Sequence, residues 1–267
     1  MLAYERTGSG DPLLLIHGMG HRRQAWAPVL ERLAEEFDVI TVDLPGHGES
    51  PAFELSGRTV REAVTYELDE FRKELGIERP HVVGNSLGGL IALEMADAGQ
   101  ARSVTALSPA GFWMGRADYL YIRGLFAGVQ TVARPLAPMV SPVLRHRTAR
   151  TLALGWFAAH PERIDPVVAA ADAANMVASR AAVRTLFGGA YRYPGALSAD
   201  VPTTIAWASR DVALLPYQAR EARRRLPHAT HCWLPGCGHV PMNDDPDLVA
   251  KVIRESARTQ PRDQQAA

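Results

Sequence analysis

Short apolar runs alternate with amphipathic stretches along the first third of the chain. Residues 13–16 are continuously apolar, which is typical of a strand buried on both faces of a parallel sheet. Three further strand-like runs follow, at residues 38–42, 81–83 and 104–107. Three stretches carry apolar residues at helical spacing, at residues 24–36, 59–75 and 87–98. Strands separated by helices predict an α/β fold with a mostly parallel sheet and right-handed crossovers.

This alternation stops in the middle of the chain and resumes near residue 198. Between residues 111 and 197 no strand is evident, and ten arginines stand against four acidic residues. Prolines are expected to divide this segment into short helical pieces, at Pro135, Pro138, Pro142, Pro161, Pro166 and Pro194. After it, strands are predicted at residues 203–207 and 229–234, and helices at residues 216–226 and 246–256.

These patterns predict two structural units. We expect a core formed by residues 1–110 and 198–267, with a helical subdomain inserted over residues 111–197. The polar end of the chain, residues 258–267, is expected to fray.

Composition narrows the classes of protein to which the chain can belong. Its 267 residues carry 29 basic and 29 acidic side chains, and a nucleic-acid-binding protein normally has a basic excess. Two cysteines cannot form a disulfide framework, and the N-terminus lacks the pattern of a secretory signal. No apolar run is long enough for a membrane span. We therefore expect a cytoplasmic protein that does not bind nucleic acid; its oligomeric state is left open.

The pattern G-x-S-x-G occurs at residues 84–88, between a predicted strand and a predicted helix. This is the setting of a nucleophile elbow, in which the serine occupies a tight, strained turn so that its hydroxyl projects from the sheet. Glycines two residues before and after Ser86 let the neighbouring backbone approach closely. Ser86 is the predicted nucleophile; the alternative is a glycine-rich turn that only packs a helix on a strand.

A serine hydroxyl needs a neighbouring base, which a third group must orient. His239 follows a predicted strand and lies at the same sheet edge as Ser86, so it is the predicted base. Asp211 also follows a strand, and the order Ser86, Asp211, His239 is the one expected of this triad type. Asp211 is the predicted orienting acid, with Asp118 as the alternative. The other interpretation of Asp211 is a turn residue or helix cap.

Acyl transfer also requires backbone N–H donors directed at the developing negative charge. Leu87 follows the nucleophile at a predicted helix N-terminus, where the helix dipole favours an anion. The second donor is expected from residues 17–20, which follow the first buried strand, and Met19 is the predicted residue. The predicted oxyanion hole therefore consists of the Met19 and Leu87 amides.

Together these segments resemble the α/β-hydrolase superfamily. The matching motifs are H-G-M-G at 17–20, D-L-P-G-H-G-E-S at 43–50, G-N-S-L-G-G at 84–89, the strand leading to Asp211, and G-H-V-P at 238–241. The resemblance covers residues 1–110 and about 198–260. It implies the α/β-hydrolase fold: a sheet of about eight strands, helices on both faces and a helical cap over the site. The short start of this chain allows for the loss of the first strand, and residues 43–50 are interpreted as a structural loop.

A serine at the elbow, in place of the aspartate of haloalkane dehalogenases and epoxide hydrolases, implies acyl transfer. We expect hydrolysis of a small to medium apolar carboxylic ester through an acyl-enzyme. The elbow is also similar to that of meta-cleavage-product hydrolases, so hydrolysis of a carbon–carbon bond in a β-diketone-like substrate is the alternative. Residues 19–23 depart from the glycine- and serine-rich oxyanion stretch of that family. An acyltransferase and a non-catalytic ligand-binding protein are further alternatives.

No metal or organic cofactor is expected, because the sequence has neither a zinc-like Cys/His spacing nor a phosphate-binding loop. The middle segment supplies many aromatic side chains and methionines. Some of them are expected to line an apolar substrate pocket, and the others to form the subdomain's own core.

Overall fold

The computed structural model describes residues 1–189, 192–193, 195, 197 and 200–259. Within these residues, seven strands form one sheet in the order β1-β3-β2-β4-β5-β6-β7. All neighbouring strands are parallel except β1, which lies antiparallel to β3 at the edge. The strands are β1 (Tyr4–Gly8), β2 (Asp11–Ile16), β3 (Phe37–Val42), β4 (His81–Asn85), β5 (Ser103–Leu107), β6 (Thr203–Ala208) and β7 (Thr230–Leu234).

The predicted fold class is therefore confirmed. The sheet has seven strands in the described part of the chain, which agrees with an expectation of about eight that allowed for the loss of one strand. Its edge strand β1 was not predicted, because its residues are all exposed and carry no apolar run. Hydrogen bonding to β3, and not burial, defines β1 as a strand.

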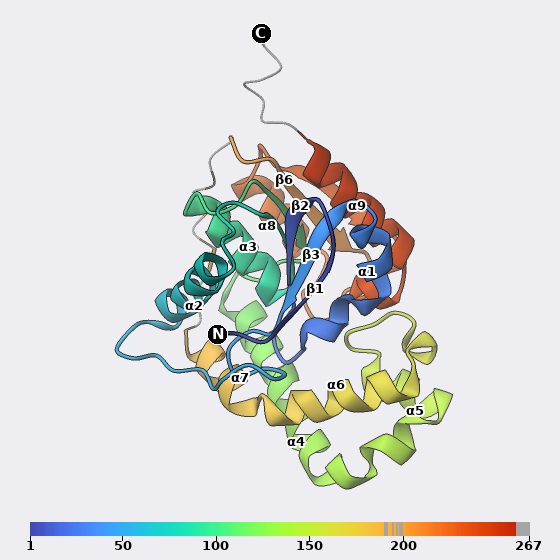
Figure 1. Ribbon diagram of the computed structural model, residues 1–267. Helices are drawn as coiled ribbons and strands as arrows, with labels where there is room; N and C mark the ends of the chain where they lie inside the picture. The colour runs from blue at the N-terminus through green and yellow to red at the C-terminus, as the bar shows by residue number, and fades with distance from the viewer. Residues whose placement is uncertain (190–191, 194, 196, 198–199, 260–267) are drawn as a thin grey trace.

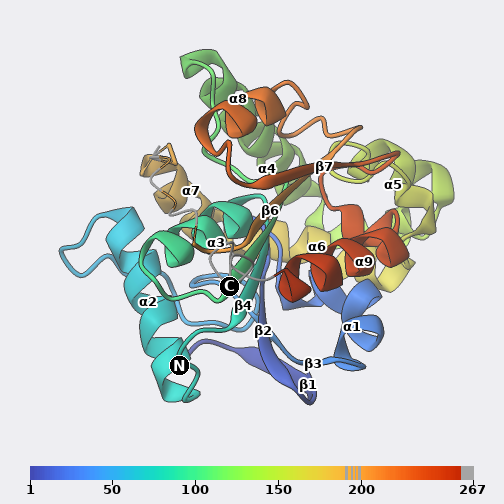
Figure 2. The same cartoon turned by 90° about the horizontal axis from the view of Figure 1, so that it is seen from above.

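The apolar run in β2 serves two hydrophobic cores, one on each face of the sheet. Leu13 and Leu15 belong to the core that contains residues of α1 (Ala27–Ala34) and α9 (Pro246–Arg258). Leu14 and Ile16 point the other way, into the core shared by α2 (Val60–Glu74), α3 (Leu87–Asp97) and α8 (Gln218–Arg225). Successive side chains of a strand face opposite sides, so a strand covered on both sides needs apolar residues throughout. Figure 2 shows α1 and α9 on one side of the sheet, with α2 and α3 on the other.

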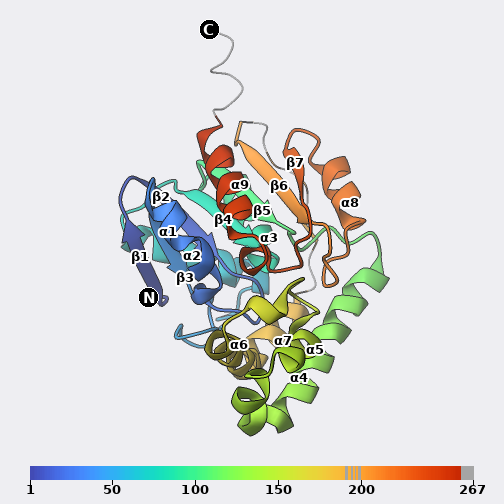
Figure 3. The same ribbon diagram turned by 90° about the vertical axis from the view of Figure 1, so that its right-hand side faces the viewer.

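The segment between β5 and β6 contains four α-helices among its described residues. They are α4 (Arg116–Leu144), α5 (Arg147–Leu154), α6 (Pro166–Ala178) and α7 (Arg180–Gly188). We call α4–α7 the cap helices. Figures 1 and 3 show them gathered at one end of the sheet, at the bottom of both views. The sheet edge that they face is the one where the predicted site residues lie.

Proline positions in the cap helices had different effects from those expected. Pro166 begins α6, as predicted, and Pro194 lies outside the described residues. Pro135 and Pro142, however, lie inside α4, which is a single helix of 29 residues. Both prolines are exposed, so the carbonyl groups that lose their hydrogen bonds can be solvated while the helix bends. The prediction that they break the segment was wrong.

No α-helix in the described ranges is both long enough and apolar enough to cross a membrane.

Candidate active site

Ser86 lies at the turn between β4 and α3, with backbone angles φ 57° and ψ −115°. A non-glycine residue in this region is strained, which is what a nucleophile elbow requires. A Cβ on Gly84 would lie 2.0 Å from the Gly88 carbonyl oxygen, and one on Gly88 would lie 2.1 Å from that of Ile16. Both glycines are therefore needed for the turn to close against the neighbouring strand.

His239 and Asp211 lie in the loops that follow β7 and β6. The His239 Nδ1 atom is 2.8 Å from Asp211 Oδ2, and both side chains are buried. The other carboxylate oxygen of Asp211 accepts the N–H groups of Ala213 and Leu214, at 2.9 and 2.8 Å. Asp211 is thus held by its own turn while it fixes the orientation of the imidazole.

The alternative acid, Asp118, is engaged elsewhere. Its carboxylate accepts the N–H of Met114 at 2.8 Å and the hydroxyl of Tyr217 at 2.5 Å. These contacts are exposed and hold the start of α4 to the core. Of the two carboxylates considered, the structure pairs Asp211 with His239.

Ser86 and His239 line the same cavity, whose volume is about 470 Å³. Gly18 and Met19 also line it, and a Cβ on Gly18 would lie 3.2 Å from the Ser86 Cβ. The loop of residues 17–20 therefore packs directly against the predicted nucleophile. The predicted nucleophile, the predicted base and the predicted oxyanion loop therefore line one cavity.

The predicted oxyanion residues, Met19 and Leu87, lie beside Ser86. Met19 follows β2, Leu87 begins α3, and both residues line a smaller cavity that Ser86 shares. Within the described residues, neither N–H donates a hydrogen bond to another protein group. Free amides of this kind are available to a developing oxyanion.

Two buried histidines, to which the sequence analysis assigned no role, hold the predicted oxyanion loop. His17 Nε2 accepts the Leu44 N–H at 2.9 Å, and His47 Nε2 accepts the Gly20 N–H at 3.0 Å. Burial lowers the pKa of His47 to about 4. Burial, together with the neighbouring His47, lowers the pKa of His17 well below its usual range. Both rings are therefore neutral acceptors near neutral pH.

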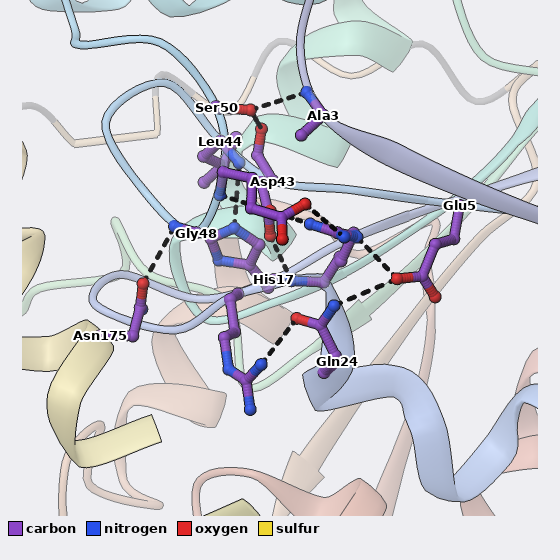
Figure 4. Close-up of polar contacts among 12 residues, drawn as sticks. Ala3, Glu5, His17, Gln24, Asp43, Leu44, Gly48, Ser50 and Asn175 are labelled. Atoms are coloured by element: carbon purple, nitrogen blue, oxygen red, sulfur yellow. Dashed lines mark hydrogen bonds and ion pairs between the residues drawn. The ribbon is translucent and has the colours of Figure 1, made fainter. Parts of the chain in front are cut away.

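Asp43 belongs to a bracing network beside the oxyanion loop, shown in Figure 4. Its carboxylate accepts the backbone N–H and the guanidinium of Arg23, at 2.6 and 2.5 Å, and the Glu49 N–H at 3.0 Å. A Cβ on Gly48 would lie 2.1 Å from Asp43 Oδ2, so the loop wraps closely around this carboxylate. The saturated hydrogen bonding agrees with the interpretation of residues 43–50 as a structural loop.

Asn175 connects the cap helices to both of these loops. Its amide nitrogen donates to the carbonyls of Gly20 and His21, at 2.9 and 2.8 Å, and its oxygen accepts the Gly48 N–H at 2.9 Å. Figure 4 shows Asn175 beside Gly48. Sequence reasoning could not find this residue, because its partners lie more than a hundred positions away along the chain.

Asn85, the second residue of the elbow motif, was also missed. Its side-chain nitrogen donates to the His239 carbonyl at 2.8 Å and to the Leu107 carbonyl at 3.2 Å. It therefore ties the loop that carries the predicted base to the strand that carries the predicted nucleophile. The only available signal was its place next to Ser86.

The large side chains of the middle segment divide between cavity and core. Phe126, Trp156, Phe157 and Met176 line the larger cavity. Trp113, Tyr119 and Phe187 line the smaller one, whereas Phe112 and Tyr193 are buried against Trp207 or each other. Met114 and Tyr121 are exposed, and Tyr191 lies outside the described residues.

Comparisons with known proteins agree with this fold. A model of the alpha/beta hydrolase family matches residues 13–252. An uncharacterized protein of Mycobacterium tuberculosis is 29% identical over 269 residues, covering 94% of this chain and 76% of that protein. The pimeloyl-[acyl-carrier protein] methyl ester esterase of Aeromonas salmonicida is 36% identical over 98 residues, 36% of this chain and 35% of that enzyme. The enol-lactonase structure from Burkholderia xenovorans has a TM-score of 0.74 at 22% identity, covering 97% and 96% of the two chains.

Proposed function

Because the chain belongs to the alpha/beta hydrolase family, we propose that it is a serine hydrolase that cleaves a small to medium apolar carboxylic ester. Hydrolase activity follows from the family, and the serine mechanism and the ester are the proposal. We further propose that residues 111–197 act as a cap subdomain on a core of residues 1–110 and 198–267.

One observation carries the proposal. The buried hydrogen bond between Asp211 and His239 lies at the same apolar cavity as Ser86 on its strained turn. A base that is oriented in this way beside a serine is the arrangement that activates a hydroxyl for attack on an acyl carbon. The local likeness to a methyl ester esterase adds support for an ester bond.

The proposed mechanism assigns a role to each group. Ser86 attacks the acyl carbon while His239 takes its proton, and Asp211 stabilises the imidazolium that forms. The Met19 and Leu87 amides hold the tetrahedral oxyanion. His239 then gives the proton to the leaving alcohol, and the acyl-enzyme is hydrolysed by a water that His239 activates in the same way.

The first test is hydrolysis of p-nitrophenyl esters of increasing acyl length. Ser86→Ala is expected to lower kcat by about 10⁴- to 10⁶-fold. The matched control is Ser256→Ala, which changes another buried serine, one on α9 whose hydroxyl donates to the Val104 carbonyl of β5. The control variant is expected to keep the wild-type rate.

Other outcomes would contradict or redirect the proposal. If the wild type hydrolyses no ester and a fluorophosphonate probe does not label Ser86, the proposal of a serine hydrolase is wrong and a ligand-binding role gains support. Labelling without ester turnover would favour the carbon–carbon hydrolase. Transfer of the acyl group to an added alcohol, faster than to water, would favour the acyltransferase.

A further inference from the structure

The cap helices expose an apolar face along α4 and α5. Its members are large aliphatic side chains with exposed fractions between 44% and 82%, namely Val132, Leu136, Met139, Val143 and Leu152. Figures 1 and 3 show α4 and α5 among the cap helices, with α4 running away from the sheet towards the bottom of both views. We call these five residues the cap face. Exposed apolar groups gathered in one place commonly mark an interaction site.

The cap face is also the mouth of the cavity that contains Ser86 and His239. All five of its residues line that cavity. The rest of the lining is mostly apolar and includes Val129, Trp156 and Phe126, which also shares the smaller cavity with Ser86. A hydrocarbon chain that enters at the cap face therefore meets apolar side chains along its path to Ser86.

The segment of the chain that carries the cap face has charged side chains of one sign. Residues 119–161 contain no aspartate or glutamate and five arginines. Arg134, Arg145 and Arg147 lie between or beside the apolar positions of α4 and α5, and all three are exposed. Apolar side chains flanked by arginine are the composition of helices that lie on anionic lipid surfaces.

We propose that the cap face docks on the surface of an anionic lipid bilayer or micelle. Lipid tails cover the aliphatic side chains, and the arginines approach the anionic headgroups. A second copy of the chain is a poorer occupant, because a symmetric contact would place the like-charged arginines of both copies together. If the proposed function holds, the substrate class is an acyl ester held in a lipid surface, whose chain reaches Ser86 without crossing water.

Vesicle binding tests the docking without any chemistry. Full-length Ser86→Ala protein is sedimented with vesicles of phosphatidylcholine, or with vesicles in which part of this lipid is replaced by phosphatidylglycerol. We expect binding to the mixed vesicles that weakens as salt is added. Arg134→Glu with Arg145→Glu, and separately Leu136→Ser with Leu152→Ser, should each weaken it by about tenfold or more.

Matched controls change the same kinds of residue away from the cap face. Arg223→Glu on α8 and Trp233→Ser on β7 are also exposed, and they are expected to leave vesicle binding unchanged. Circular dichroism of every variant checks that the fold is retained. A cap-face variant that has unfolded is replaced by Met139→Gln, whose side chain is similar in size.

Three results would overturn the docking. The first is no binding to either vesicle, and the second is equal loss in the controls and the cap-face variants. The third is a concentration-dependent dimer that the leucine variants abolish, since the face would then be covered by a second copy. Turnover of the water-soluble p-nitrophenyl acetate by the wild type tests the proposed function separately, so either idea can fail alone.

Discussion

The proposed triad is held partly by groups close in the sequence and partly by groups far from it in the sequence. Asp211 is held by two N–H groups of its own turn, but the His239 loop is held by Asn85 on another strand. The sequence predicted Asp211 and His239, because both follow strands whose ends meet at one sheet edge. It did not predict Asn85, because a side chain that bonds a distant carbonyl leaves no periodic pattern.

The pairing of His239 with Asp211 predicts unequal effects for two aspartates. Asp211→Asn is expected to lower kcat by about 10³- to 10⁴-fold, since an amide cannot stabilise the imidazolium or enforce the required tautomer. Asp118→Asn, which alters only exposed contacts with Met114 and Tyr217, is expected to change kcat by less than about threefold. Steady-state kinetics on one p-nitrophenyl ester measures both. Equal losses in the two variants would make Asp118 a functional acid after all.

Among the helices and strands, apolar periodicity predicted the elements that are buried and regular. It failed for elements whose structure depends on other interactions. The helix expected over residues 59–75 is α2, whose Thr59 and Glu62 form a capping box. Strand β1 was missed because it is fully exposed, and α4 was divided in prediction because a single-residue rule was applied to Pro135 and Pro142. Strand β1 depends on backbone pairing, and α4 depends on the solvation of carbonyl groups that lose their hydrogen bonds. The spacing of apolar residues carries neither kind of information.

The position of the predicted oxyanion loop also depends on its contact with a whole helix, α6. Asn175→Ala removes three hydrogen bonds that join α6 to Gly20, His21 and Gly48. We expect kcat to fall by about tenfold, since Gly20 adjoins the Met19 amide and small displacements of an oxyanion donor are costly. The kinetics of p-nitrophenyl ester hydrolysis measure the change.

A second variant of α6 separates this effect from simple destabilisation. Asp165 caps the start of α6 by accepting the N–H groups of Val167 and Val168. Asp165→Ala should lower the free energy of unfolding by about 1 kcal/mol and leave kcat unchanged. If both variants lose kcat in proportion to their loss of stability, Asn175 has no positioning role.

For the molecule as a whole, two buried groups make stability depend on pH in opposite directions. Burial lowers the pKa of His47 to about 4, so folding favours its neutral form. Its stabilising contribution is fully present above the unfolded-state pKa of about 6.5 and is lost as the pH falls towards 4. Burial raises the pKa of Glu94 to about 7, although Arg61 opposes this shift. Folding therefore favours the protonated carboxyl, and this contribution is lost as the pH rises from about 4.5 to 7.

These opposite signs predict how two variants change the pH profile of unfolding. Between pH 5 and 6.5 each group can change the free energy of unfolding by up to about 1.4 kcal/mol per pH unit. His47→Gln removes the stabilising contribution that rises with pH, so the slope of the free energy of unfolding against pH should decrease. Glu94→Gln removes the term that falls with pH, so the slope should increase. Urea unfolding of the wild type and both variants at several pH values measures the slopes. Parallel curves for all three proteins would show that neither group titrates differently in the folded and unfolded states.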